Sequence, residues 1–231
     1  MKLLVFQHVP HEHPGYIAEY AREKRIELDI VELWTPYSMP PIGNYDGIII
    51  LGGPMGVYEG YPSEADELKA IQAALGRIPI LGVCLGSQLL ANALGAQVHP
   101  NVKDGRRIKE VGYFMVDLTE KGKRSPALYG FASPVKVLEW HGDAFELPEG
   151  ADLLATSPLC ENQAFSLQNV HGFMFHFEFT PEMVANQIRV DGEWMQADNN
   201  VDVKVLLDES RRSADLMRKQ CFQLLDNFLA K

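Results

Sequence analysis

Short apolar strands that alternate with helices constrain the fold of this chain more than any other feature of its sequence. The stretch 45–51 becomes continuously apolar after its Asp and Gly, which is typical of a parallel strand buried on both faces, and Gly52-Gly53-Pro54 ends it. Further strands are expected at 2–7, 27–33 and 79–83, and the helices between and after them at 17–25, 63–75 and 85–94. This alternation predicts a doubly wound, mostly parallel α/β sheet with a binding crevice at the carboxyl ends of its strands.

The second half of the chain has a looser pattern. Strand-like pieces at 112–118, 164–167 and 172–177 predict an extension of the sheet. After Thr180-Pro181 the sequence predicts two helices, at 182–195 and 203–229. No linker rich in Gly or Ser interrupts the chain, so we expect a single domain over residues 1–231, with a core of 1–181 and a C-terminal helical extension of 182–231.

Composition and charge exclude several classes of protein. Hydrophobic residues make up 46% of the chain, enough for a sizeable core, and the formal net charge of -10 argues against nucleic acid as a partner. No apolar run approaches the roughly 20 residues needed to cross a bilayer, and no signal peptide is evident. The three cysteines show no metal-binding spacing and fit a reducing compartment. We therefore expect a cytoplasmic protein with no membrane partner.

Cys84 lies where a predicted strand runs straight into a predicted helix. Gly82 and Gly86 flank it and would let the backbone bend tightly, as in a nucleophile elbow, which exposes one side chain at the edge of a sheet. The positive end of the helix dipole would stabilise a thiolate there. A free cysteine is more often a small buried hydrophobe, but this spacing favours a nucleophile.

A cysteine nucleophile needs a base and a group that orients the base. Within Phe175-His176-Phe177-Glu178-Phe179, a strand would project His176 and Glu178 to one side and the phenylalanines toward the core. By itself this segment would indicate a half-buried strand with two polar residues on its wet face. Together with Cys84, it predicts a catalytic trio of Cys84, His176 and Glu178.

The stretch Gly82-Val83-Cys84-Leu85-Gly86-Ser87-Gln88 resembles the G-x-C-x-G-x-Q signature of class I glutamine amidotransferases. The resemblance covers roughly residues 45 to 180 and is nearest to the amidotransferase domain of GMP synthetases. It implies a flavodoxin-like domain, without a cofactor, that hydrolyses the side-chain amide of glutamine to glutamate and ammonia. The chain departs from the family at Phe177, where the family usually has proline between the catalytic His and Glu.

Two backbone N–H groups are expected to stabilise the oxyanion that forms when Cys84 attacks a carboxamide. Leu85 follows the nucleophile at the start of the helix. Gly52-Gly53-Pro54 resembles the G-G-P loop of the family, in which the glycine before the proline supplies the second N–H, here that of Gly53. Without the cysteine turn, this tripeptide would be an ordinary loop.

Other residues are expected at the substrate. The resemblance implies that Gln88 binds the amino-acid end of glutamine, although it could instead cap the turn. Trp140-His141-Gly142-Asp143 resembles the S-H-G-D loop beside the glutamine pocket of the family, with Trp140 in place of serine, and its alternative is an ordinary turn with an aromatic anchor. His141, Gly142 and Asp143 are therefore candidate substrate-binding residues.

A metal site is conceivable at His8, His11 and His13, because histidine is a common zinc ligand. No Cys or acidic set with suitable spacing completes a shell, so we expect these to be solvent-exposed loop histidines and expect no metal.

Three alternatives to an amidotransferase stay open at this point. The first is a stand-alone γ-glutamyl hydrolase or peptidase that uses the same trio. The second is a non-catalytic regulatory subunit with the same fold. The third is a flavodoxin-like cysteine hydrolase of the stress-related group, which generally lacks a late His-x-Glu segment. For an amidotransferase, a separate synthetase subunit that receives the ammonia is the partner implied.

Overall fold

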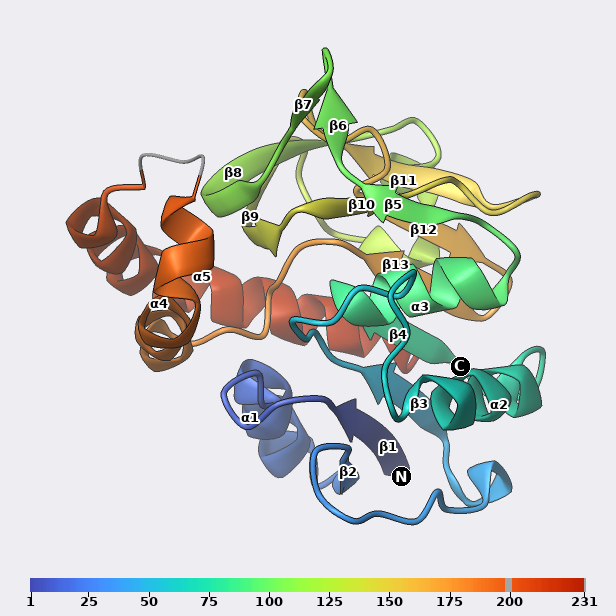
Figure 1. Cartoon of the computed structure of the whole chain (residues 1–231). Helices are drawn as coiled ribbons and strands as arrows, with labels where there is room; N and C mark the ends of the chain where they lie inside the picture. Colours follow the sequence, from blue (N-terminus) through green and yellow to red (C-terminus); the bar gives the residue numbers. More distant parts are fainter. Residues whose placement is uncertain (198–200, 231) are drawn as a thin grey trace.

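The fold is built on one large mixed sheet, seen in a computed structural model that describes residues 1–197 and 201–230. Its nine strands follow the order β2-β1-β3-β4-β13-β12-β11-β8-β9 (Figure 1). The five strands from β2 to β13 pair in parallel, and the others pair antiparallel. The strands of this sheet are β1 (Lys2–Gln7), β2 (Glu27–Glu32), β3 (Gly47–Ile50), β4 (Ile80–Val83), β8 (Glu110–Leu118), β9 (Val135–His141), β11 (Asp152–Thr156), β12 (Ala164–Leu167) and β13 (Val170–Phe173).

Helices cover both faces of the parallel part. The helices are α1 (Gly15–Lys24), α2 (Glu64–Ala74), α3 (Leu85–Ala93), α4 (Pro181–Gln196) and α5 (Val203–Phe228). Buried residues of α1 and α5 share one core with the sheet, and those of α2 and α3 share a second core on the opposite face. This is the flavodoxin-like, doubly wound architecture expected from the sequence, with the predicted helical extension at its C-terminal end.

Strand β1 shows why these apolar runs form buried strands. Leu3 and Val5 point into the core that α1 and α5 cover, whereas Leu4 and Phe6 point into the core that α2 and α3 cover. Successive side chains of a strand project to opposite faces, so a strand buried on both faces must be apolar at every position. All four side chains are at most 1% exposed.

The prediction of a strand at 172–177 is wrong in its second half. Strand β13 pairs with β4 only as far as Phe173. Beyond it, the N–H of Met174 donates to the carbonyl of Gln163, and His176 exchanges backbone hydrogen bonds with Leu138 of β9. The chain bends here because its pairing partner changes from β4 to β9, which a local apolar pattern does not reveal.

The C-terminal helices pack onto the rest of the protein in two places. In α5, Met217, Leu224 and Phe228 contribute to the core shared with α1. In α4, Met183 and Val184 contribute to a third core with residues of β8 and β9. Two small two-stranded sheets complete the fold, one of β5 (Val98–Pro100) and β10 (Asp143–Phe145), the other of β6 (Val102–Lys103) and β7 (Arg106–Arg107), which is at the top of Figure 1. None of the described helices is both long enough and apolar enough to span a membrane.

Candidate active site

Cys84 occupies the turn at which β4 leads directly into α3. Its φ of 50° and ψ of −110° are rare for a residue with a side chain, and such conformations are held only where the surroundings enforce them. The N–H of Cys84 donates to the carbonyl of Phe173 over 2.8 Å. A Cβ atom on Gly86 would lie 2.1 Å from the carbonyl oxygen of Ile50, so α3 can approach β3 this closely only with glycine at this position.

His176 and Glu178 lie beside this turn. The Nδ1 of His176 is 2.6 Å from Oε1 of Glu178, and both side chains are buried. Burial alone would lower the pKa of His176, but the Glu178 carboxylate and a hydrogen bond with the Cys84 thiol raise that pKa well above its ordinary value. The sequence predicted that a regular strand would place His176 and Glu178 on one side. In the structure the two side chains do meet, but they do so on the bend after β13. The Cys84 thiol also lies 3.8 Å from the carbonyl of Trp140.

The N–H groups of Gly53 and Leu85 come from the loop after β3 and from the start of α3, which are in contact. A Cβ atom on Gly53 would lie 2.9 Å from Cδ2 of Leu85, and Gly53 lines the same cavity as Cys84. Among the described residues, neither N–H donates to another group of the protein. Neither N–H is therefore engaged within the described protein, as the predicted oxyanion role would require.

His8 fixes the orientation of the Gly52–Gly53 peptide, contrary to the expectation that it is solvent-exposed. Its Nδ1 lies 3.0 Å from the carbonyl oxygen of Gly52 and its Nε2 lies 2.9 Å from Oε2 of Glu67 on α2, with both side chains fully buried. A carbonyl oxygen only accepts, so Nδ1 carries the proton and donates it. In a trans peptide the C=O and N–H point in opposite directions, so this bond also sets the direction of the Gly53 N–H.

The other two early histidines differ from each other. His13 is exposed, as expected, and His11 is half-buried, where burial lowers the pKa of its imidazole. No group of three or more His, Cys, Asp or Glu side chains in the described part of the chain is arranged to hold a metal ion.

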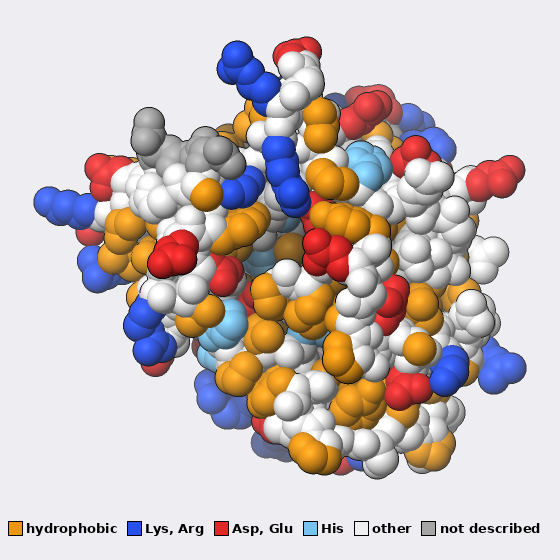
Figure 2. Space-filling model, viewed as in Figure 1, with side chains coloured by type: hydrophobic (Ala, Val, Ile, Leu, Met, Phe, Trp, Pro, Cys, Tyr) orange, Lys and Arg blue, Asp and Glu red, His pale blue; other side chains and the backbone are white. Residues whose placement is uncertain are grey.

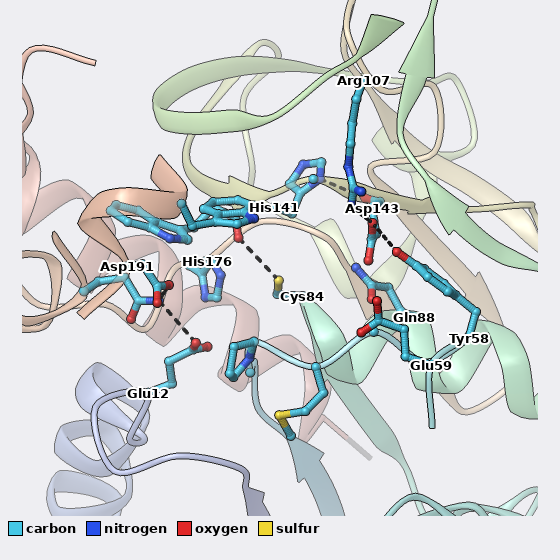
Figure 3. Close-up of a pocket in the computed structure, with 18 residues that line it drawn as sticks. Glu12, Tyr58, Glu59, Cys84, Gln88, Arg107, His141, Asp143, His176 and Asp191 are labelled. Carbon is cyan, nitrogen blue, oxygen red and sulfur yellow. Dashed lines mark hydrogen bonds and ion pairs between the residues drawn. The ribbon is translucent and has the colours of Figure 1, made fainter. Parts of the chain in front are cut away.

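A cavity of about 310 Å³ opens at Cys84, which is at the small end of the range of ligand pockets. Figure 2 shows a hollow in this face of the molecule with acidic side chains near its margin. Figure 3 shows Cys84 between two groups of lining residues. We name the first the Gln88 lobe, which comprises Tyr58, Glu59, Gln88, Arg107 and Asp143. We name the second the Glu12 lobe, which comprises Glu12, Gln187, Asp191 and Trp194.

The Gln88 lobe contains two of the predicted substrate residues, Gln88 and Asp143. Asp143 accepts hydrogen bonds from the hydroxyl of Tyr58 at 3.1 Å and from the guanidinium of Arg107 at 2.9 Å. Gln88 is buried one turn along α3, with its amide 4.0 Å from the sulfur of Met174. Besides Gln88 and Asp143, the cavity is lined by His141 and Gly142, so the structure brings all four predicted residues to Cys84. Tyr58, Glu59 and Arg107 were not predicted, because nothing in the local sequence separates them from ordinary loop residues.

His141 belongs to a buried group of charges behind the cavity. Its Nδ1 donates to the carbonyl of Asp143 at 3.0 Å, and its Nε2 lies 3.1 Å from Glu139 and 3.4 Å from Glu110. Burial would lower the pKa of His141, but the Glu110 and Glu139 carboxylates raise it well above its ordinary value. Burial raises the pKa of Glu139. The side chain of His141 is therefore held in a fixed direction beside the cavity.

The Glu12 lobe was not predicted at all. Glu12 follows β1 in the loop before α1, and a Cβ atom on Gly52 would lie 2.2 Å from its Oε2 and 3.1 Å from Cε1 of His176. The other residues of the lobe stand at positions 187, 191 and 194 of α4, a spacing that puts side chains on one helix face. The amide of Gln187 donates to Glu12 at 3.3 Å and to Asp191 at 2.7 Å. The position of Glu12 after a parallel strand was the one available signal.

Comparison with known proteins identifies relatives along most of the chain. The family model "Glutamine amidotransferase class-I" matches residues 15–190. The glutamine amidotransferase-like protein YfeJ of Salmonella typhimurium is 32% identical over 197 residues, which cover 82% of this chain and 80% of that protein. A glutamine-hydrolysing GMP synthase of Streptococcus pyogenes is 33% identical over 175 residues, 69% of this chain but only 31% of that longer protein.

Solved structures share the fold as well. A glutamine amidotransferase from Thermotoga maritima superposes with a TM-score of 0.90 at 29% sequence identity, over 100% of this chain and 99% of that one. A second, from Methylobacillus flagellatus, has a TM-score of 0.88 at 23% identity over 99% and 94% of the two chains. The similarity of fold therefore includes the C-terminal helices.

Proposed function

Because the chain belongs to the class I glutamine amidotransferase family, we propose that it hydrolyses a γ-glutamyl amide, with glutamine as the simplest substrate, through a thioester on Cys84. One observation carries this proposal. The strained turn at Cys84 and the His176 imidazole line one cavity, and Glu178 lies 2.6 Å from that imidazole, an arrangement that suits a nucleophile, its base and the group that orients the base.

The proposed reaction begins when His176 takes the proton of the Cys84 thiol and the sulfur attacks the carboxamide carbon. The oxyanion that forms accepts hydrogen bonds from the N–H groups of Gly53 and Leu85. When the C–N bond breaks, His176 returns the proton to the leaving nitrogen, and a γ-glutamyl thioester remains on Cys84. Water, deprotonated by His176, then attacks the thioester and releases glutamate and the free thiol. Glu178 keeps the imidazole oriented throughout.

We propose that the amino-acid end of the substrate lies in the Gln88 lobe. A free amino acid carries one ammonium and one carboxylate, and this lobe presents groups of both complementary charges. Arg107 is its cation, while Glu59 and Asp143 are its anions. Gln88 adds an amide that can donate and accept.

We propose further that the core and the helical tail act as one unit. Residues of α5 complete the main core, and α4 supplies Gln187, Asp191 and Trp194 to the cavity. Removal of the tail would therefore expose apolar surface and open one wall of the site.

Two fates of the product follow for this site. Ammonia could pass to a separate synthetase subunit, since the matched GMP synthases are glutamine-hydrolysing and much longer than this chain. Alternatively, the enzyme acts alone as a γ-glutamyl hydrolase. The cavity extends beyond His176 into the Glu12 lobe. This extension favours the second candidate, because ammonia is too small a leaving group to need a pocket lined by side chains.

Release of glutamate from glutamine and from γ-glutamyl amides by the purified protein tests the proposal. Cys84→Ser should abolish release. Cys160→Ser is the matched control, because Cys160 is buried away from the cavity and burial raises the pKa of its thiol to about 11. Glutamate release that survives in Cys84→Ser would refute the proposed nucleophile.

A further inference from the structure

The cavity extends past Cys84 on the side of His176, toward which the leaving group departs. In the proposed reaction His176 protonates the leaving nitrogen, so that nitrogen must lie next to the imidazole. The Glu12 lobe begins at this point, since Oε2 of Glu12 and Cε1 of His176 both lie close to the position that a Cβ atom on Gly52 would take. Figure 3 shows Glu12 and Asp191 on the opposite side of Cys84 from Gln88 and Tyr58.

The Glu12 lobe has the charge and chemistry of a site for an ammonium group. It presents the carboxyl groups of Glu12 and Asp191, whereas the indole of Trp194 is already covered by the ammonium of Lys109, 4.9 Å from its ring centroid. The one arginine that lines the cavity among the described residues, Arg107, pairs with Asp143 in the other lobe. An ammonium has three N–H donors and no acceptor, and it is attracted to carboxylates.

An unsatisfied acceptor in this lobe points to a ligand independently of the charges. Gln187 is only 1% exposed, and its amide nitrogen donates hydrogen bonds to Glu12 and Asp191. Its Oε1 has no hydrogen-bond partner within the described part of the chain, and Gln187 lines the cavity. A buried amide oxygen without a donor is costly, so a donor on a ligand would remove that cost.

The burial of Glu12 supports the same occupant. Glu12 as a whole is 5% exposed, and its carboxyl receives one hydrogen bond, from Gln187 at 3.3 Å. Burial raises its pKa to about 7, so its ionised form is disfavoured without a counter-charge. The charge of His176 opposes this effect only in part, and a cation bound in the lobe would oppose it further.

We propose that the Glu12 lobe binds the leaving group of a γ-glutamyl amide whose leaving amine carries a second, protonated amino group, as in the mono-γ-glutamyl amide of a linear diamine. This inference rests on the proposed function and names its substrate class. In the reaction, water and the amide give glutamate and the free diamine. The C–N bond breaks, His176 donates a proton to the leaving nitrogen, and the second ammonium stays bound to Glu12 and Asp191 until release.

The test compares kcat/KM for three amides of equal length. These are the mono-γ-glutamyl amide of 1,4-diaminobutane, the uncharged γ-glutamyl pentylamide, and an analogue that ends in a carboxylate. The kcat/KM of the diamine amide should be higher than that of the uncharged amide by about tenfold or more, which is the factor for one charge-assisted hydrogen bond. The carboxylate analogue should have the lowest kcat/KM of the three. In Glu12→Gln and in Asp191→Asn this preference should fall toward unity. Glu193→Gln, exposed on α4 and outside the cavity, is the matched control.

The outcomes separate this inference from the proposed function. Equal rates for the charged and uncharged amides, with glutamine hydrolysed normally, would overturn the diamine site and leave the Cys84 chemistry intact. If no substrate is hydrolysed, the proposed function fails, and binding of 1,4-diaminobutane to Cys84→Ala decides the lobe. Calorimetry should show binding that Glu12→Gln weakens about tenfold or more. Absence of binding would overturn the inference.

Discussion

Replacement of His8 by two different amides should separate its two hydrogen bonds. In His8→Asn, the side-chain amide replaces Nδ1 and can still donate to the carbonyl of Gly52. In His8→Gln, the longer side chain replaces Nε2 and can still reach Glu67, but the carbonyl of Gly52 loses its partner. If the Gly53 N–H stabilises the oxyanion, only His8→Gln should release the peptide that carries it.

The hydrogen bond itself bounds the size of the effect. A buried carbonyl left without its donor costs about 1–3 kcal/mol. At about 1.4 kcal/mol per factor of ten, rotation of the Gly52–Gly53 peptide would lower kcat between about fivefold and about 100-fold. Removal of an oxyanion donor altogether costs about 10²–10³ in kcat, which sets the ceiling. KM should hardly change, because the oxyanion exists only in the transition state.

Steady-state glutamate release by the two variants measures this effect. We expect the kcat of His8→Gln to fall within that range and the kcat of His8→Asn to stay within about threefold of the wild type. Both variants should lose stability, because Gly52 or Glu67 loses a buried partner, so thermal unfolding must first show that each is folded at the assay temperature. Equal losses of kcat in the two folded variants, or none in His8→Gln, would refute the positioning role.

Three further predictions concern the same site. Glu178→Gln should lower kcat by as much as about 10⁴-fold, the loss when a triad carboxylate becomes an amide, and near-normal turnover would contradict its role as orienter. Burial raises the pKa of Glu12 from 4.5 to about 7, so the wild-type protein loses stability as pH rises through that interval, where only the unfolded chain is ionised. In denaturant unfolding, the free energy of unfolding of Glu12→Gln should therefore be about 3 kcal/mol higher than that of the wild type at pH 8 and equal to it near pH 4. Equal free energies of unfolding at both pH values would contradict the burial argument. Cys84→Gly should be about 1–3 kcal/mol more stable than Cys84→Ala, since only glycine relieves the positive φ, and a reversed order would show that the turn is unstrained.

The local pattern of apolar and turn residues was sufficient to predict the parallel half of the sheet. Strand β1 begins at Lys2 and ends at Gln7, as its apolar run predicts, because each of its faces is covered by helices. The turn at Cys84 was also predictable, since Gly82 and Gly86 mark it in the sequence. Both features depend on neighbours along the chain.

The parts of the site that sequence could not predict depend on contacts between distant segments. The bend that carries His176 forms because the chain leaves β4 to pair with Leu138 of β9. The hydrogen bond between Gln187 and Glu12 joins residues 175 positions apart. The burial of His8 requires Glu67 of α2 to face it across the sheet edge. No local spacing encodes these pairings, so a buried histidine and a ligand lobe were missed.

Detection of the acyl-enzyme tests the central claim most directly. The wild-type protein would be mixed with glutamine or the diamine amide, quenched in acid within one turnover, and digested for mass spectrometry. We predict a γ-glutamyl group on the peptide that contains Cys84, unchanged in Cys160→Ser and absent in Cys84→Ala. Turnover without acylation of Cys84, or acylation of another residue, would contradict the account.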